Sequence, residues 1–241
     1  MLGIANGLTH LDVLGWASTG AAGLRLGIGV VLLLIGLVGG RIIPSFTRNW
    51  LVKQGETRLP APAGRFDAAA LAVTAAALSA WVVAPAWAGV APLMALAALA
   101  NAVRLARWRW DLTGAEPLVW VLHLGFAWLP AGFALMALTP VLGLPPTAAV
   151  HALTGGAMAT MIVAVTSRVT RGHTGRALIA GRATTAVYAL VTLAAVARVA
   201  AGIVTGAMMP LLAIGGAAWV GAFGLFLAIY GPMLLSRRPE R

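Results

Sequence analysis

The sequence contains no cysteine, and only 10% of its 241 residues are charged. Without cysteine the chain forms no disulfides, thiolate metal sites or iron–sulfur clusters, and it attaches no haem through thioether bonds. Four histidines and eight methionines remain as ligands for a metal or a haem. Only 6 residues are acidic, and no two of them are placed as a carboxylate pair for acid–base catalysis.

Several catalytic motifs are also absent from the sequence. There is no GxSxG serine motif, no glycine-rich phosphate loop ending in GK[ST], and no HExxH zinc motif. Hydrolysis, phosphoryl transfer and dinucleotide-linked hydride transfer are therefore not predicted for this chain.

Apolar residues, in contrast, make up 61% of the sequence. A soluble domain of this length cannot bury so much apolar surface in one core, so the sequence predicts an all-α, polytopic membrane helical bundle. A membrane-spanning helix needs roughly 20 apolar residues, and seven stretches approach that length. The predicted spans are about Ala22–Gly40, Phe66–Ala86, Val90–Leu105, Pro117–Leu138, Pro146–Thr166, Leu178–Val204 and Met208–Leu235. The second and third are joined by so few residues that we expect a tight helical hairpin.

Basic residues alternate with these stretches and predict an orientation. A net charge of +11 would indicate nucleic-acid binding in a soluble protein, but here 15 of the 17 basic residues fall in the connections 41–65, 104–109 and 168–182 and in the tail 237–241. Arginine and lysine near helix ends are retained in the cytoplasm. We therefore predict a cytoplasmic C-terminus, an external N-terminus and the lipid bilayer, not nucleic acid, as the partner.

Two arginines lie inside predicted spans, Arg25 in the first and Arg198 in the sixth. An intramembrane charge normally faces the bundle interior or reaches the headgroups. One interpretation is therefore that each side chain snorkels to the outer surface. For either arginine alone this interpretation is the favoured one. The other interpretation is that both hold an anionic ligand such as a haem propionate, and it gains support because no acidic residue within the spans pairs with them.

His151, near the outer end of the fifth span, is the first candidate ligand. An i, i+3, i+4, i+7 pattern places His151, Thr154, Gly155 and Met158 on one helical face. Gly155 leaves room for a flat macrocycle, and the Met158 thioether is a soft ligand for Cu(I). The same spacing is equally typical of a small-residue packing face with a hydrogen-bonded histidine. His10 lies on the same side of the membrane.

His123 defines a second candidate site on the inner side. It stands beside Trp120 and Phe126 on the fourth span, and each of His123 and His151 lies about 9 Å deep, so roughly 12 Å along the membrane normal separates them. They should therefore not share one metal ion. A packed, hydrogen-bonded histidine is the favoured interpretation for His123, and His173 in the following inner loop is the other histidine on this side.

Four segments together resemble the NnrS family of bacterial membrane proteins, which is associated with nitric oxide and nitrosative stress. They are Gly39–Asn49 (GGRIIPSFTRN), Pro117–Pro130 (PLVWVLHLGFAWLP), His151–Met161 (HALTGGAMATM) and Gly172–Arg176 (GHTGR). The resemblance implies a haem- and copper-containing protein of the bacterial cytoplasmic membrane. It makes His151 the favoured axial ligand, with Arg25 and Arg198 as propionate partners.

Members of this family generally have more helices than the seven predicted here, so the chain resembles the C-terminal portion. A truncated gene model, a split gene whose separate chain supplies the other helices, and a naturally short member all fit. The first span should then present a small-residue face, Gly20, Gly23, Gly27 and Gly36, to a partner helix. A different functional class also stays open: a metal-free small-molecule transporter or a partner subunit of a membrane complex.

Overall fold

The computed structural model describes residues 1–236, which form an all-helical bundle and contain no strand. The α-helices are α1 (Leu2–Val13), α2 (Gly20–Leu34), α3 (Gly40–Lys53), α4 (Arg65–Val83), α5 (Val90–Ala106), α6 (Pro117–Leu142), α7 (Pro146–His151), α8 (Ala159–His173), α9 (Arg182–Ile203) and α10 (Met208–Leu235). Two π-helical turns, η1 (Ile35–Gly39) and η3 (Ala152–Met158), join α2 to α3 and α7 to α8. Two 3₁₀ turns, η2 (Trp110–Leu112) and η4 (Thr205–Ala207), lie in connections.

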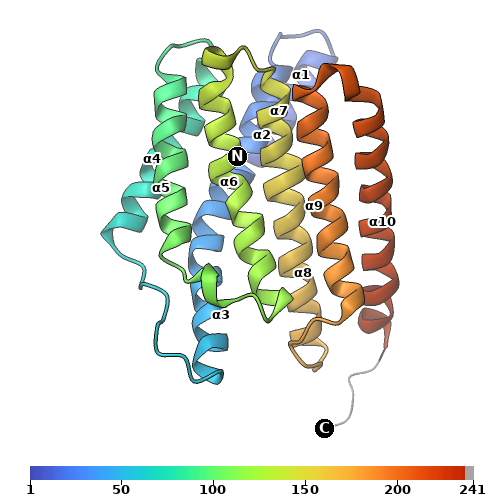
Figure 1. The fold of residues 1–241 in the computed structure, drawn as a ribbon. Coiled ribbons are helices and arrows are strands. Elements are labelled where there is room, and N and C mark those ends of the chain that lie inside the picture. Colours follow the sequence, from blue (N-terminus) through green and yellow to red (C-terminus); the bar gives the residue numbers. More distant parts are fainter. Residues whose placement is uncertain (237–241) are drawn as a thin grey trace.

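The long helices lie alongside one another (Figure 1). Within the described residues, six are long and apolar enough to cross a membrane, and α5 is a shorter apolar helix of 17 residues. The first of the six runs from Gly20 to Lys53, well past the predicted end at Gly40. It passes through Pro44 without ending, as membrane helices do where a neighbouring irregular turn adjusts the backbone hydrogen bonds. Arg41 and Arg48 therefore lie on a helix, not in a connection.

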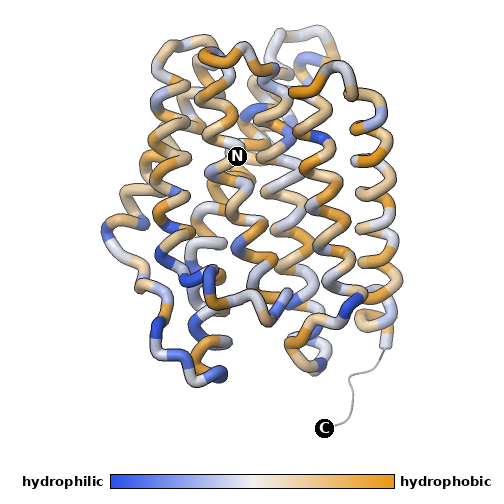
Figure 2. The backbone as a smooth tube through the Cα atoms, in the orientation of Figure 1, coloured by the Kyte–Doolittle hydropathy of each residue, from blue (hydrophilic) through white to orange (hydrophobic). Residues whose placement is uncertain are grey.

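The two ends of the bundle differ in polarity. We call the end that carries the α3 terminus and the α5–α6 and α8–α9 connections the basic end; hydrophilic residues gather there, at the bottom of Figure 2. The α4–α5, α6–α7 and α9–α10 connections lie at the opposite end. This is the arrangement that the alternating charges predict, although the basic tail 237–241 lies outside the described residues. Which end faces the cytoplasm stays a prediction.

The hairpin predicted for the second and third spans is confirmed as α4 and α5, which pack against each other. The predicted glycine face of the first span is also covered, but by the chain itself. A Cβ added to Gly23 would lie 2.6 Å from the Ala5 carbonyl oxygen of α1, and one on Gly36 would lie 3.4 Å from Leu71 of α4. The helix that fills most of this face is therefore α1, so the face does not require a separate chain.

α6 is the central helix of the bundle and contacts α3, α5, α7, α8 and both π-helical turns. Glycines allow α6 to approach closely the continuous helix formed by α7, η3 and α8. A Cβ on Gly125 would lie 2.9 Å from the Met161 sulfur, one on Gly132 would lie 2.5 Å from Leu153, and one on Gly156 would lie 2.5 Å from the Trp128 ring. This interlocking fixes the height of η3, and therefore of His151, relative to α6.

Candidate functional site

A cavity of about 370 Å³ lies between η3, α9 and α10 beside His151. We call it the His151 cavity. Its lining residues are His151, Thr154, Gly155, Ala194, Ala195, Arg198, Leu212, Gly215, Gly216 and Trp219. The structure thus brings His151 and Arg198, which are far apart in the sequence, to one cavity.

The imidazole of His151 is half-buried and makes no hydrogen bond to any residue of the described chain. The Thr154 hydroxyl, one turn away, donates instead to the Val150 carbonyl oxygen at 2.8 Å. Two glycines of the lining, Gly155 of η3 and Gly216 of α10, leave open space, because a Cβ added to either would meet nothing within 4 Å. The cavity therefore offers a free imidazole, a guanidinium and two lining positions without side chains.

Met158 does not share this cavity, so the expectation that it lies on the same helical face as His151 is wrong. The reason is the π-helical turn η3, which holds about one residue more per turn than an α-helix and so rotates the residues that follow it. Met158 and Ile162 instead line a cavity of about 330 Å³ against α2, η1 and α3. Among the described residues no group of three or more histidine, cysteine or acidic side chains is placed to hold a metal ion.

Arg25 and His10 also lie away from the His151 cavity. The Arg25 guanidinium donates to the Val82 carbonyl oxygen at 3.4 Å, close to the C-terminus of α4. A cation is favourable at this negative end of the helix dipole. His10 is exposed on α1, which packs against α2. Of the predicted outer residues, only His151 and Arg198 come together.

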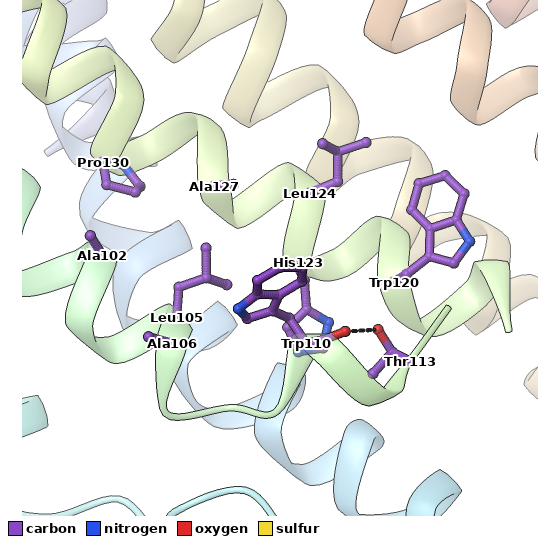
Figure 3. Close-up of a pocket in the computed structure, with 10 residues that line it drawn as sticks. All are labelled: Ala102, Leu105, Ala106, Trp110, Thr113, Trp120, His123, Leu124, Ala127 and Pro130. Carbon is purple, nitrogen blue, oxygen red and sulfur yellow. Dashed lines mark hydrogen bonds between the residues drawn. The ribbon is translucent and has the colours of Figure 1, made fainter. Parts of the chain in front are cut away.

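His123 lines a larger cavity, of about 500 Å³, between α5, η2 and α6 (Figure 3). Trp110 and Trp120 are part of its lining. The imidazole is only 4% exposed, and both ring nitrogens have protein partners: Nδ1 lies 3.2 Å from the Val119 carbonyl oxygen and Nε2 lies 3.3 Å from the Thr47 hydroxyl. These contacts favour the packing interpretation. His173 is exposed at the end of α8 and does not line this cavity.

A buried polar cluster near the basic end was not predicted. The Arg104 guanidinium of α5 is 1% exposed and forms an ion pair with Asp67 of α4 at 3.1 Å. It also donates to the Gly36 carbonyl oxygen of η1 at 3.0 Å and to Asn101 Oδ1 at 3.2 Å. Gly40 leaves the space that the guanidinium occupies, since a Cβ there would collide with it. The cluster therefore ties α4 and α5 to the π-helical turn η1.

The spacing of polar residues in the sequence points to this cluster. Asn101 and Arg104 are three residues apart on an otherwise apolar stretch, and Asp67 and Thr74 are seven apart on the preceding one, so each pair shares a helical face. The structure joins the pairs through a hydrogen bond from Asn101 to the Thr74 hydroxyl at 2.8 Å. The charge pattern alone places Arg104 in a cytoplasmic connection, because it stands close to Arg107 and Arg109.

The family model described as NnrS protein matches residues 1–238. The chain belongs to the NnrS family. No curated protein and no solved structure matches it. Together with the six apolar helices, the family assignment makes this NnrS-family chain a multi-pass membrane protein that contacts the lipid bilayer.

Three of the segments that resemble the NnrS family meet around α6. A Cβ added to Gly39 would lie 3.4 Å from Phe126 and 3.7 Å from Met161, so the first segment touches both of the others. Thr47 of the first segment also reaches His123 of the second. The family segments therefore form the packed interface that positions the His123 and His151 cavities on either side of α6.

Proposed function

We propose that this NnrS-family protein binds haem in the His151 cavity and acts in the bacterial response to nitric oxide and nitrosative stress. The observation that carries the proposal is the cavity itself. It holds an imidazole without a protein partner among the described residues, and the Arg198 guanidinium lines the same space. An axial ligand for the iron and a cation that pairs with the propionate carboxylates are two contributions that a protein can make to a haem site.

The residues of the cavity have separate roles in this proposal. His151 offers a ring nitrogen as axial ligand, and Arg198 offsets the negative charge of a propionate. Gly155 and Gly216, which carry no side chain, leave room for a flat ring, and Trp219 adds an aromatic surface. A bound haem supplies an iron that binds small diatomic molecules such as nitric oxide. At about 370 Å³, the cavity is near the lower end of the range of pockets that hold small molecules, so it would enclose only part of a haem.

The position in the membrane follows from the charge distribution. If the basic end faces the cytoplasm of a bacterial inner membrane, the C-terminus is cytoplasmic and the N-terminus external. His151 then lies toward the external side, because its helix begins at the opposite end of the bundle. Nitric oxide reaches such a site directly from the bilayer or from outside.

A second candidate function is that of a metal-free small-molecule transporter or a partner subunit of a membrane complex. The His123 cavity favours it, because this cavity is larger and its lining contains no arginine, lysine or carboxylate. His123 would then act as a polar group in an otherwise apolar path.

Absorbance spectroscopy of the purified full chain separates the two candidates. We expect a Soret band that shifts on reduction, and we expect His151→Ala to abolish or shift this band while expression and thermal stability are kept. His123→Ala should act more weakly on the band, and His173→Ala, at an exposed position, should leave it unchanged.

Each contrary result has a definite meaning. A colourless chain after expression with added haem would contradict the proposal and favour the transporter or subunit. An unchanged band in His151→Ala together with a lost band in His123→Ala would move the haem to the basic end. If neither variant changes the band, the axial ligand comes from another residue or another chain, and the assignment of His151 is wrong.

A further inference from the structure

A third cavity, of about 480 Å³, opens at the basic end, away from both histidine cavities. It lies between the end of α3, the start of α6, the end of α8 and the α8–α9 connection, and we call it the Arg168 cavity. Its lining residues are Asn49, Trp50, Lys53, Gln54, Ala115, Glu116, Arg168, Ala177, Leu178 and Ile179. Neither the His151 cavity nor the proposed haem uses any of them.

The two cations of this cavity form no direct ion pair in residues 1–236, although the Glu116 carboxylate lines the same cavity. No ion pair and no side-chain hydrogen bond involves Lys53 or Arg168 there. The Arg168 guanidinium is half-buried and held in place by stacking on the Phe46 ring, with 4.2 Å between its carbon and the ring centroid. A cation–π contact of this kind holds the guanidinium against the ring but leaves its N–H groups free to donate.

Further hydrogen-bond donors line the same cavity. The side chains of Asn49, Trp50 and Gln54 make no hydrogen bond to the described residues. The single acidic residue, Glu116, is already engaged: its Oε1 accepts the backbone N–H groups of Leu118 and Ala180, each at 3.0 Å. Glu116 thus serves as the N-cap of α6 and does not neutralise Arg168 through an ion pair.

We propose that the Arg168 cavity binds a phosphate group that carries one negative charge, as in the headgroup of an anionic phospholipid. The lining carries two positive charges, on Lys53 and Arg168, and one negative charge, on Glu116, so its net charge is +1. A phosphodiester, with one negative charge, balances this net charge, whereas a phosphate dianion carries more negative charge than the lining can balance. The exposed apolar side chains of Leu178 and Ile179, which line the same cavity, are suited to contact with an acyl chain. Basic pockets at helix ends are known to hold such headgroups.

Native mass spectrometry of the full chain in detergent, titrated with defined ligands, tests this proposal. We expect phosphatidylglycerol to bind more tightly than phosphatidylcholine, which has the same phosphodiester but no net charge. Arg168→Gln and Lys53→Gln should each weaken phosphatidylglycerol binding about fivefold, the effect of one basic residue near an anionic headgroup. The matched control is Arg48→Gln, which removes one exposed charge from α3 outside the cavity and should change binding less than twofold.

Several results would overturn the proposal. Equal binding of the two lipids shows that charge is not recognised, and an equal loss in Arg48→Gln shows only a diffuse attraction to the basic end. Displacement of phosphatidylglycerol by millimolar inorganic phosphate, abolished in Arg168→Gln, would keep the phosphate site but refute the lipid source. If Arg168→Gln lowers the thermal stability, Lys53→Gln, at an exposed position, carries the test alone. None of these outcomes depends on whether haem binds at His151.

Discussion

Asp67→Asn should destabilise the bundle far more than its small change in shape suggests. The substitution keeps a side-chain oxygen that can accept the hydrogen bond from the backbone N–H of Gly64, as Asp67 does at 3.1 Å. It removes the only carboxylate that pairs with Arg104 among residues 1–236. The Arg104 guanidinium is then a buried charge with only the Gly36 carbonyl and Asn101 as acceptors. Breaking a buried ion pair from one side costs about 3–5 kcal/mol.

Arg104→Met should cost less. It leaves Asp67 with the Gly64 N–H and with Arg107, whose guanidinium lies 3.5 Å away and is partly exposed. The double variant Asp67→Asn with Arg104→Met removes both charges, and replacing a buried pair by groups of similar volume is often close to neutral. We therefore expect the double variant to be more stable than Asp67→Asn alone.

Thermal unfolding followed by tryptophan fluorescence measures these differences, since the chain has nine tryptophans. For a chain of this length, 3–5 kcal/mol corresponds to a fall in Tm of roughly 6–20 °C. Arg107→Gln is the control and should cost less than about 1 kcal/mol, as expected for a partly exposed pair. The reasoning is refuted if the double variant unfolds at a lower temperature than Asp67→Asn, because the two losses would then add instead of compensating.

Three further predictions test the topology and the packing. Reporter fusions in the connections should behave as cytoplasmic at Thr57, Ala115 and Gly175 and as external at Leu144 and Gly206; a periplasmic signal at Gly175 would reverse the orientation. Gly23→Leu should detach α1 from α2, because a Cβ already meets the Ala5 carbonyl, and faster proteolysis of the first 20 residues would show it. Gly156→Ala should cost about 1–3 kcal/mol by pressing on the Trp128 ring, whereas Gly155→Ala, with no neighbour within 4 Å, should leave the Tm unchanged.

The sequence was sufficient for the helical class and for most helix positions, because long apolar runs separated by charged connections have few other solutions. It was sufficient for the α4–α5 hairpin for the same reason. It did not reveal the π-helical turns, since residues 35–39 and 152–158 have the composition of ordinary membrane helices. The position of Met158 was wrong for this reason alone.

The ion pair between Asp67 and Arg104 could not be predicted from the sequence, for a different reason. The two residues are separated by 37 positions, and only the packing of α4 on α5 brings their side chains together. Similarly, the neighbouring Trp120 and Phe126 indicated that His123 is a packed histidine, but its contact with Thr47 depends on how α3 crosses α6. Local patterns identified the polar residues, and tertiary packing decided their partners.

The π-helical turn η3 has a consequence for how the length of the chain can vary. Deleting one residue between 152 and 158 would restore an ordinary α-helical turn, but it would rotate all of α8 by about 100°. Met161 would lose its contact with Gly125, and Arg168 would lose its contact with the Phe46 ring. Insertions and deletions among NnrS-family sequences should therefore fall in connections such as 54–64 and 174–181, and hardly ever inside this span.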